Sequence, residues 1–238
     1  MSLADWVAAS AVVALGASLH GSVGFGMSLL STPLLVLVDP RLVPAPVICV
    51  SALLTVLILL RERQAVDLKG LPWALVGALP GVWLGGSAVG ALPTRGLSIV
   101  IALLILTAVG VITVGRPPRR SPLTMGLTGT VSGFMGTAAG IGGPPIALIY
   151  RNERGPTIRA SISGFFLVLT PLQLVSLTAV GRLGAWELGA AAALAPGMCL
   201  GFLMSSRVRA QVDAGLIRVV ILIVSTVSAG AVLLRALL

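Results

Sequence analysis

Charge is scarce in this sequence. Only 10% of its 238 residues are charged, whereas 57% are hydrophobic and the mean hydropathy is +1.08. Soluble domains carry charge on about a quarter of their residues, and so few ionic groups could not cover a water-facing surface on a chain of this size. The composition therefore excludes a soluble globular protein and indicates that most of the chain faces lipid.

Disulfide partners and metal ligands are equally scarce. The only two cysteines, Cys49 and Cys199, lie inside apolar segments, where a thiol behaves as a small buried hydrophobe. All seven acidic residues lie in loops or at the ends of apolar stretches. No carboxylate is thus placed to bind a metal cation or to relay a proton inside the membrane, and we expect no disulfide, metal or cofactor.

Basic residues outnumber acidic ones, and the formal net charge is +9. They stand in short loops between apolar runs, where Lys and Arg set membrane orientation. The sequence has no contiguous basic face or aromatic platform, so we expect no nucleic-acid binding. No Lys or Arg precedes Arg41. The N-terminus therefore lacks the basic region of a cleavable signal peptide, and we expect the first segment to stay in the mature protein.

Eight apolar stretches lie between the charged loops. Six have the length of about 20 residues that a helix needs to cross the hydrocarbon core; they are 42–60, 71–92, 96–115, 160–181, 186–206 and 214–238. The other two, 4–38 and 123–150, are longer and are interrupted by glycine near their middle. Because clustered glycine frees the backbone from the helix, we predict a helix, a break and a second helix in each.

An internal repeat relates the two interrupted stretches. A shift of 116 residues places Gly24-Phe25-Gly26 on Gly140-Ile141-Gly142, Pro80-Gly81 on Pro196-Gly197, and Leu84-Gly85 on Leu200-Gly201. Repetition at one fixed offset indicates a duplicated unit. We predict two repeats, residues 1–120 and 121–238.

The basic residues indicate how the interrupted stretches cross the membrane. If every stretch crosses once, the 16 Lys and Arg residues divide evenly between the two sides. If both interrupted stretches return to the side they entered, twelve fall on one side and four, Arg41, Arg95, Arg182 and Arg235, on the other. The second arrangement has the asymmetry that the positive-inside rule expects. It predicts an all-α transmembrane bundle of two inverted repeats, each with a glycine-broken helical hairpin, and both termini outside the cytoplasm.

The two breaks form the predicted binding site. Irregular backbone is tolerated at membrane depth only where protein or a water-filled cavity surrounds it, so the breaks should face each other inside the bundle. Helices beginning near Gly26 and Gly142 would direct free N–H groups and a positive dipole end into that interior, which favours an anion. His20 lies in the first break and either handles substrate or protons or caps the broken backbone.

Polar side chains near the breaks are further candidates. Ser28 and Thr137 are favoured because they flank the breaks; the others are Ser22, Ser31, Thr32, Thr170 and Gln173. The full set of predicted substrate-binding residues is His20, Gly24, Phe25, Gly26, Ser28, Thr137, Gly140, Ile141, Gly142 and Gly143.

These motifs resemble a known family. The Gly24-Phe25-Gly26 element, the Ser31-Thr32-Pro33-Leu34 segment after it and the glycine-rich run from Gly136 to Pro145 are similar to the sulfite exporter TauE/SafE family, also called the toluene sulfonate uptake permease group. The resemblance implies a secondary transporter in the bacterial inner membrane that moves a small anion such as sulfite, a sulfonate or sulfoacetate by alternating access. The resemblance leaves open whether a proton or a sodium ion is the coupling ion, and whether the protein forms a homodimer.

Two other classes of function compete with a transporter. A rhomboid-like intramembrane protease would need a serine nucleophile and a histidine within hydrogen-bonding reach, and Ser132-Gly133 with His20-Gly21 supplies both residue types. Catalysis does not need two matching halves, so the repeat argues against an enzyme. An anion channel or a structural subunit is the second competitor. Channels often use charged rings, and the sequence has no such ring.

Overall fold

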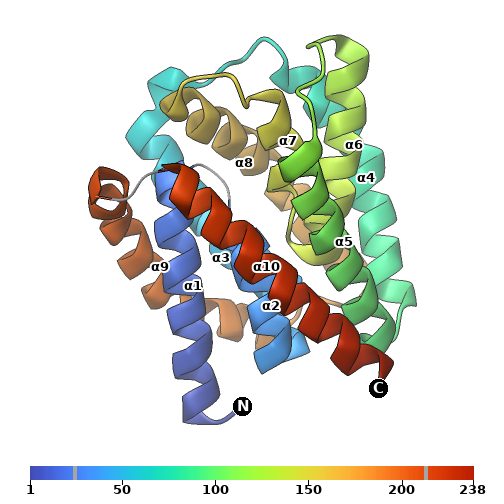
Figure 1. Ribbon diagram of the computed structural model, residues 1–238. Helices are drawn as coiled ribbons and strands as arrows, with labels where there is room; N and C mark the ends of the chain where they lie inside the picture. Colours follow the sequence, from blue (N-terminus) through green and yellow to red (C-terminus); the bar gives the residue numbers. More distant parts are fainter. Residues whose placement is uncertain (24–25, 212–213) are drawn as a thin grey trace.

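The chain folds as a bundle of helices. The computed structural model describes residues 1–23, 26–211 and 214–238, and every regular element in these ranges is a helix (Figure 1). The ten α-helices are α1 (Leu3–Val23), α2 (Met27–Val38), α3 (Ala45–Glu62), α4 (Leu71–Ala91), α5 (Thr94–Val114), α6 (Pro122–Ala139), α7 (Gly143–Ile149), α8 (Gly155–Ala179), α9 (Ala185–Gln211) and α10 (Ala214–Leu237). Two short 3₁₀ helices, η1 (Pro40–Leu42) and η2 (Arg63–Ala65), flank α3.

Seven helices of the described ranges are long and apolar enough to cross a membrane: α1, α3, α4, α5, α8, α9 and α10. Six of them occupy the six uninterrupted stretches, and α1 is the longer arm of the first interrupted one. Large apolar side chains such as Leu84 and Leu203 are more than half exposed on the outside of the bundle, where lipid would cover them. The prediction of an all-α, multi-pass membrane bundle is confirmed.

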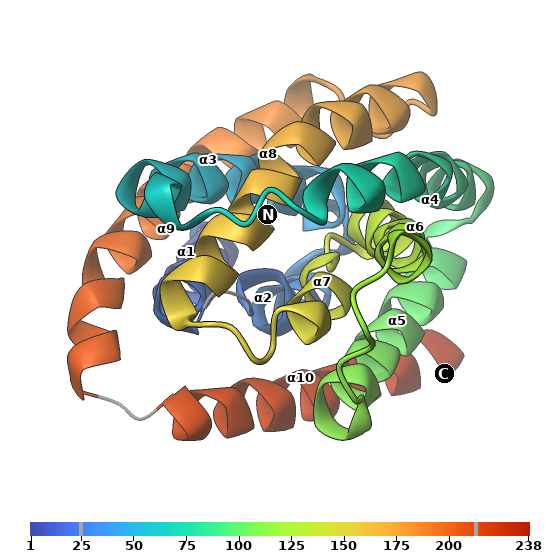
Figure 2. The same ribbon diagram turned by 90° about the horizontal axis from the view of Figure 1, so that it is seen from above.

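Both long stretches are broken where glycine clusters. In Figure 1, α1 crosses the bundle and α2 runs back beside it, while α6 and α7 form a second hairpin on the other side. Seen from above, α2 and α7 lie inside a ring formed by the longer helices (Figure 2). The two return helices thus occupy the interior of the bundle, as the tolerance for broken backbone there requires.

Helices of the two predicted repeats pack against one another along glycine-lined seams. A Cβ atom at Gly201 of α9 would lie 2.0 Å from the carbonyl oxygen of Ala14 in α1, and one at Gly85 of α4 would lie 2.8 Å from that of Phe134 in α6. Gly85 and Gly201 are related by the 116-residue offset. Only glycine allows the backbones to approach this closely, so the glycines of α4 and α9 hold α1 and α6 in place.

One assumption behind the charge count is wrong. The charge count treats Arg159 and Arg218 as part of the loops next to their apolar stretches, but Arg159 lies in α8 and Arg218 in α10. Only 5% of the Arg159 surface is exposed, because Glu62 from the end of α3 pairs with its guanidinium at 2.8 Å. The local sequence pattern places such a charged residue in a loop, because it does not reveal the partner, which is nearly a hundred residues away in the chain.

Candidate functional site

The first break separates α1 from α2. The residue before α2 is Gly26, whose φ of 119° lies in the left-handed region that side chains other than glycine rarely adopt. Gly24 and Phe25, both predicted to bind substrate, lie outside the described residues. α2 is 12 residues long. The backbone N–H groups of its first turn have no carbonyl one turn earlier in the helix to bond to, and Gly26, Ser28 and Leu29 at this end of α2 line a cavity.

The second break separates α6 from α7. Gly140 ends α6 with a φ of 72°; its N–H donates to the carbonyl oxygen of Gly136, and the N–H of Ile141 donates to that of Met135. Gly142 precedes α7, and prolines fill the first turn of that helix, as expected of residues that lack an N–H. The hydroxyl of Ser132 donates to the carbonyl oxygen of Gly142. α7 has only seven residues, so its dipole is weaker than that of α2.

The two breaks meet at one cavity of ≈ 50 Å³. One water molecule needs about 10–15 Å³ on this measure, so the space holds roughly three to five waters or one small polyatomic anion. Its walls come from both breaks and from α3 and α8; the residues that line it are His20, Gly26, Ser28, Leu29, Ile48, Ser51, Thr55, Gly136, Gly140, Ile141, Gly142, Gly143, Pro144, Phe166, Thr170 and Gln173.

The structure brings most of the predicted site residues to this cavity. Seven of them line it: His20, Gly26, Ser28, Gly140, Ile141, Gly142 and Gly143. Thr137 is not among the lining residues; it is fully buried, and its hydroxyl donates to the carbonyl oxygen of Gly133 one turn earlier in α6. Its proximity to the break in sequence does not turn its side chain toward the cavity.

Several lining residues were not predicted. Thr170 and Gln173 ranked below Ser28 and Thr137, and Ser51, Thr55 and Phe166 were not considered. Thr170 and Gln173 lie on consecutive positions of one face of α8, so their polar character inside an apolar stretch is the signal that could have raised them. Ser51 and Thr55, four residues apart, likewise lie on one face of α3.

Two buried polar atoms at the cavity have no hydrogen-bond partner within the described part of the chain. They are Nδ1 of His20 and Nε2 of Gln173, and both residues line the cavity. Burying a polar group without a partner is costly. Among the hydrogen bonds of the described residues none joins His20 to Ser132, whose hydroxyl is held by Gly142. This hydrogen bond places Ser132 in the second break, where it holds the backbone before α7.

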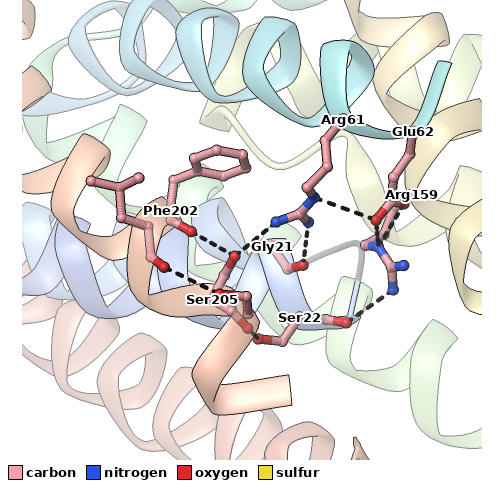
Figure 3. A network of polar contacts seen from close by, with 9 residues as sticks. Gly21, Ser22, Arg61, Glu62, Arg159, Phe202 and Ser205 are labelled. Carbon is pink, nitrogen blue, oxygen red and sulfur yellow. Dashed lines mark hydrogen bonds and ion pairs between the residues drawn. The ribbon is translucent and has the colours of Figure 1, made fainter. Parts of the chain in front are cut away.

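Two arginines close the first hairpin at its tip (Figure 3). Arg61 donates from Nη2 to the carbonyl oxygen of Gly21 at 2.8 Å, and Arg159 donates from Nη1 to that of Ser22 at 3.1 Å. Glu62 accepts from Nε of Arg159 at 2.8 Å. Carbonyl groups at the C-terminal end of a helix lack N–H donors within it and attract cations. The arginines of α3 and α8 therefore hold the last turn of α1 beside His20.

Helix α9 joins the same network. Ser205 accepts from Nη1 of Arg61 at 3.1 Å through its hydroxyl oxygen, and its carbonyl oxygen accepts from the Ser22 hydroxyl at 2.9 Å. Four helices, α1, α3, α8 and α9, are thus tied together at one end of the bundle, immediately next to the cavity.

Comparison with known proteins gives one match. Neither a search of curated proteins nor a search of solved structures found a match. The family described as sulfite exporter TauE/SafE matches residues 9–232, a range that includes both glycine breaks, all the cavity-lining residues and the arginine network at the hairpin tip. The match extends over nearly the whole chain, and the protein is a multi-pass membrane protein of the sulfite exporter TauE/SafE family.

Proposed function

We propose that the chain is a secondary transporter that moves a small oxyanion, such as sulfite or a small sulfonate, across the bacterial inner membrane by alternating access. The observation that carries the proposal is the single cavity formed by both glycine breaks. It combines room for one small anion with the first turn of α2, whose N–H groups and dipole favour negative charge. His20 is the only ionisable residue among those that line the cavity.

The arrangement of the two hairpins supports an inverted repeat. The tip of the first lies against the C-terminal end of α3, where Arg61 bonds to Gly21. The tip of the second lies against the N-terminal part of α3, because a Cβ atom at Gly140 would be 3.2 Å from Val47. The tips point toward opposite ends of the same spanning helix. Transporters with this architecture bind substrate between two such broken segments and expose it to either side.

The distribution of arginines supports an orientation with both termini outside the cytoplasm. The four arginines predicted outside lie together at one end: Arg41 stacks on Trp186, Arg182 donates to Leu92, Arg95 to Ala236 and Arg235 to Leu37. At the other end, Arg120 pairs with both Asp67 and Glu153. The more basic end faces the cytoplasm under the positive-inside rule. His20 is the candidate for coupling if the driving ion is a proton.

Side chains added at the breaks test the proposed site. Gly26→Val forces a branched residue into the left-handed region, and a Cβ atom at Gly142 would lie 2.7 Å from the carbonyl oxygen of Ser132 and 2.8 Å from the Phe166 ring. We expect each variant to insert into the membrane at near wild-type yield and to lose sulfite uptake in proteoliposomes. Gly110→Val is the matched control, because no atom lies within 4 Å of a Cβ at Gly110 in α5. Wild-type uptake in both break variants would refute the site.

A further inference from the structure

Gln173 presents an unsatisfied donor to the cavity. The residue lies in α8 with 1% of its surface exposed, and no hydrogen-bond partner of its Nε2 atom exists in the described chain. Four buried side-chain polar atoms in the described ranges are unpaired in this way, and two of them, in His20 and Gln173, belong to residues that line the cavity. A primary amide can donate two hydrogen bonds. A buried amide without a partner is stabilised when a ligand or water supplies the acceptor.

Gly136 makes room for this amide. A Cβ atom at Gly136 of α6 would lie 2.5 Å from Nε2 of Gln173 and 3.4 Å from the Cα atom of Gly142. The amide nitrogen therefore lies against bare backbone, beside the second break. Any side chain at position 136 would push the end of the flexible glutamine side chain away, whereas the helix backbones could stay where they are.

We propose that Gln173 binds substrate, with its Nε2 atom donating a hydrogen bond to an oxygen of the anion, and that the cavity is thereby selective for a polyatomic oxyanion over a halide. This inference rests on the proposed transport function and adds the residue that recognises the substrate. The donors belong to different elements, because the N–H groups of the first turn come from α2 and the amide from α8. A ligand with several oxygens satisfies both groups at once, whereas a monatomic ion has no separate atoms to offer them.

The Gln173 amide that recognises the anion is uncharged, so a substitution that introduces a charge at this position tests the recognition directly. Gln173→Leu removes the donor and puts an apolar side chain of similar size in its place. Gln173→Glu keeps the shape but replaces the donor with a carboxylate, which repels an anion. A hydrogen bond to a charged group contributes enough that its loss weakens binding by about 10- to 100-fold. We expect that loss for sulfite and methanesulfonate in Gln173→Leu, and a larger loss in Gln173→Glu.

The measurement is ligand-linked stabilisation of purified protein in detergent, from which the dissociation constants of sulfite, methanesulfonate and chloride are obtained. Gln64→Leu is the matched control, because the same exchange is made at an exposed position in η2. Gly136→Ala reaches the same amide by another route and leaves Gln173 itself in place. We expect Gly136→Ala to weaken sulfite binding, and the double variant Gly136→Ala/Gln173→Leu to bind no more weakly than Gln173→Leu alone.

The outcomes separate this inference from the function on which it rests. If the wild-type protein responds to none of the anions, the proposed function fails. If the wild type binds sulfite and the Gln173 variants bind it equally well, Gln173 is structural and only the inference fails, even if their unfolding temperatures without ligand are lower. Equal affinity of the wild type for chloride and sulfite would overturn the selectivity for oxyanions. Additive losses in the double variant would show that Gly136 acts independently of the amide.

Discussion

Arg159 uses one guanidinium to satisfy two different buried groups. Its Nε atom donates to Glu62, and its Nη1 atom donates to the carbonyl oxygen of Ser22 at the end of α1. Arginine suits this position because its donors point in several fixed directions. Glu62 is only 10% exposed, and it also lies 3.4 Å from Nε of Arg61. Two arginines therefore share one carboxylate, and the excess positive charge falls on the carbonyl groups of α1.

Removing Arg159 should destabilise the fold. Arg159→Met removes the closer of the two guanidinium groups that contact Glu62, and breaking a buried pair from one side costs about 3–5 kcal/mol. Because Arg61 still contacts the carboxylate, we expect about 2–3 kcal/mol, or a fall in Tm of roughly 5–10 °C in detergent.

The double variant Arg159→Met/Glu62→Gln provides the control, since it removes the uncompensated charge together with its partner. It should recover more than half of the lost stability. If the single variant unfolds at the wild-type temperature, the ion pair does not hold the hairpin tip.

The glycines of the site could be predicted from the sequence, but the side chains opposite them could not. Clustered glycine inside an apolar stretch predicts a break in the helix. The sequence pattern alone is enough to locate the break at Gly140. Ser51 and Thr55 lie in an uninterrupted stretch in which a hydroxyl more often bonds to its own helix. Their place at the cavity depends on how α3 packs against α8, which no local pattern records. Thr137 is the opposite case: it flanks the break in the sequence, but its hydroxyl bonds to its own helix and it does not line the cavity.

At the scale of elements, the helix seams depend on glycine. Gly77, Gly81 and Gly85 follow one face of α4, and a Cβ atom at any of them would lie 2.0–2.8 Å from backbone oxygen of α6. Gly197 and Gly201 face α1 in the same way at 2.0–2.7 Å. In lipid there is little hydrophobic drive between helices, so close backbone packing supplies much of their association.

Bulk in one of these seams should separate the helices. Gly201→Leu places four carbon atoms where backbone oxygen of Ala14 lies 2.0 Å from the Cβ position. Overpacking of this kind costs about 1–3 kcal/mol or more, and we expect a lower yield of monodisperse protein and a lower Tm. Gly189→Leu, in the same helix α9, meets no atom within 4 Å; it should behave as the wild type does in size-exclusion chromatography and thermal unfolding. Equal behaviour of both variants would contradict a packing role for the seam.

The lengths of the elements followed from apolar stretches more reliably than their ends. Stretch 160–181 predicted α8, yet the helix begins at Gly155 and includes Arg159, whose charge is neutralised by Glu62 of α3. Charge marks the end of an apolar run along the sequence. A helix ends where its backbone hydrogen bonds end. The end of the apolar run and the end of the helix differ by a turn or more where an arginine of the helix bonds to a buried acceptor.

At the scale of the whole molecule, the first hairpin returns to the end where the chain begins. Arg41 donates from its side chain to Asp39, and this contact holds the pKa of the Asp39 carboxyl below its usual value, with a smaller lowering by the positive charge of the N-terminus. The N-terminal ammonium group is therefore near the segment after α2. The two ends of the stretch 4–38 thus lie on the same side of the bundle (Figure 1).

Single cysteines can locate the two faces in cells. In a variant with Cys49 and Cys199 replaced by serine, we expect cysteines at Ser2 and Arg41 to react with a membrane-impermeant maleimide added outside. Cysteines at Lys69 and Arg116, in the basic loops, should react only after the cells are opened. Labelling of Ser2→Cys and Arg41→Cys from opposite sides would contradict the hairpin, and labelling of both only from inside would reverse the orientation.

The crossed pairing of helices has a consequence for how the protein is made. Helix α1 leaves the ribosome first, but the α9 glycines that receive it, Gly197 and Gly201, are synthesised about 180 residues later. The corresponding seam between α4 and α6 also joins a helix of the first half of the chain to one of the second half. A ribosome that stopped after residue 120 would release α1 and α4 without α9 and α6, the helices that pack closely against their backbones. Both seams can therefore close only after the second half of the chain has been synthesised.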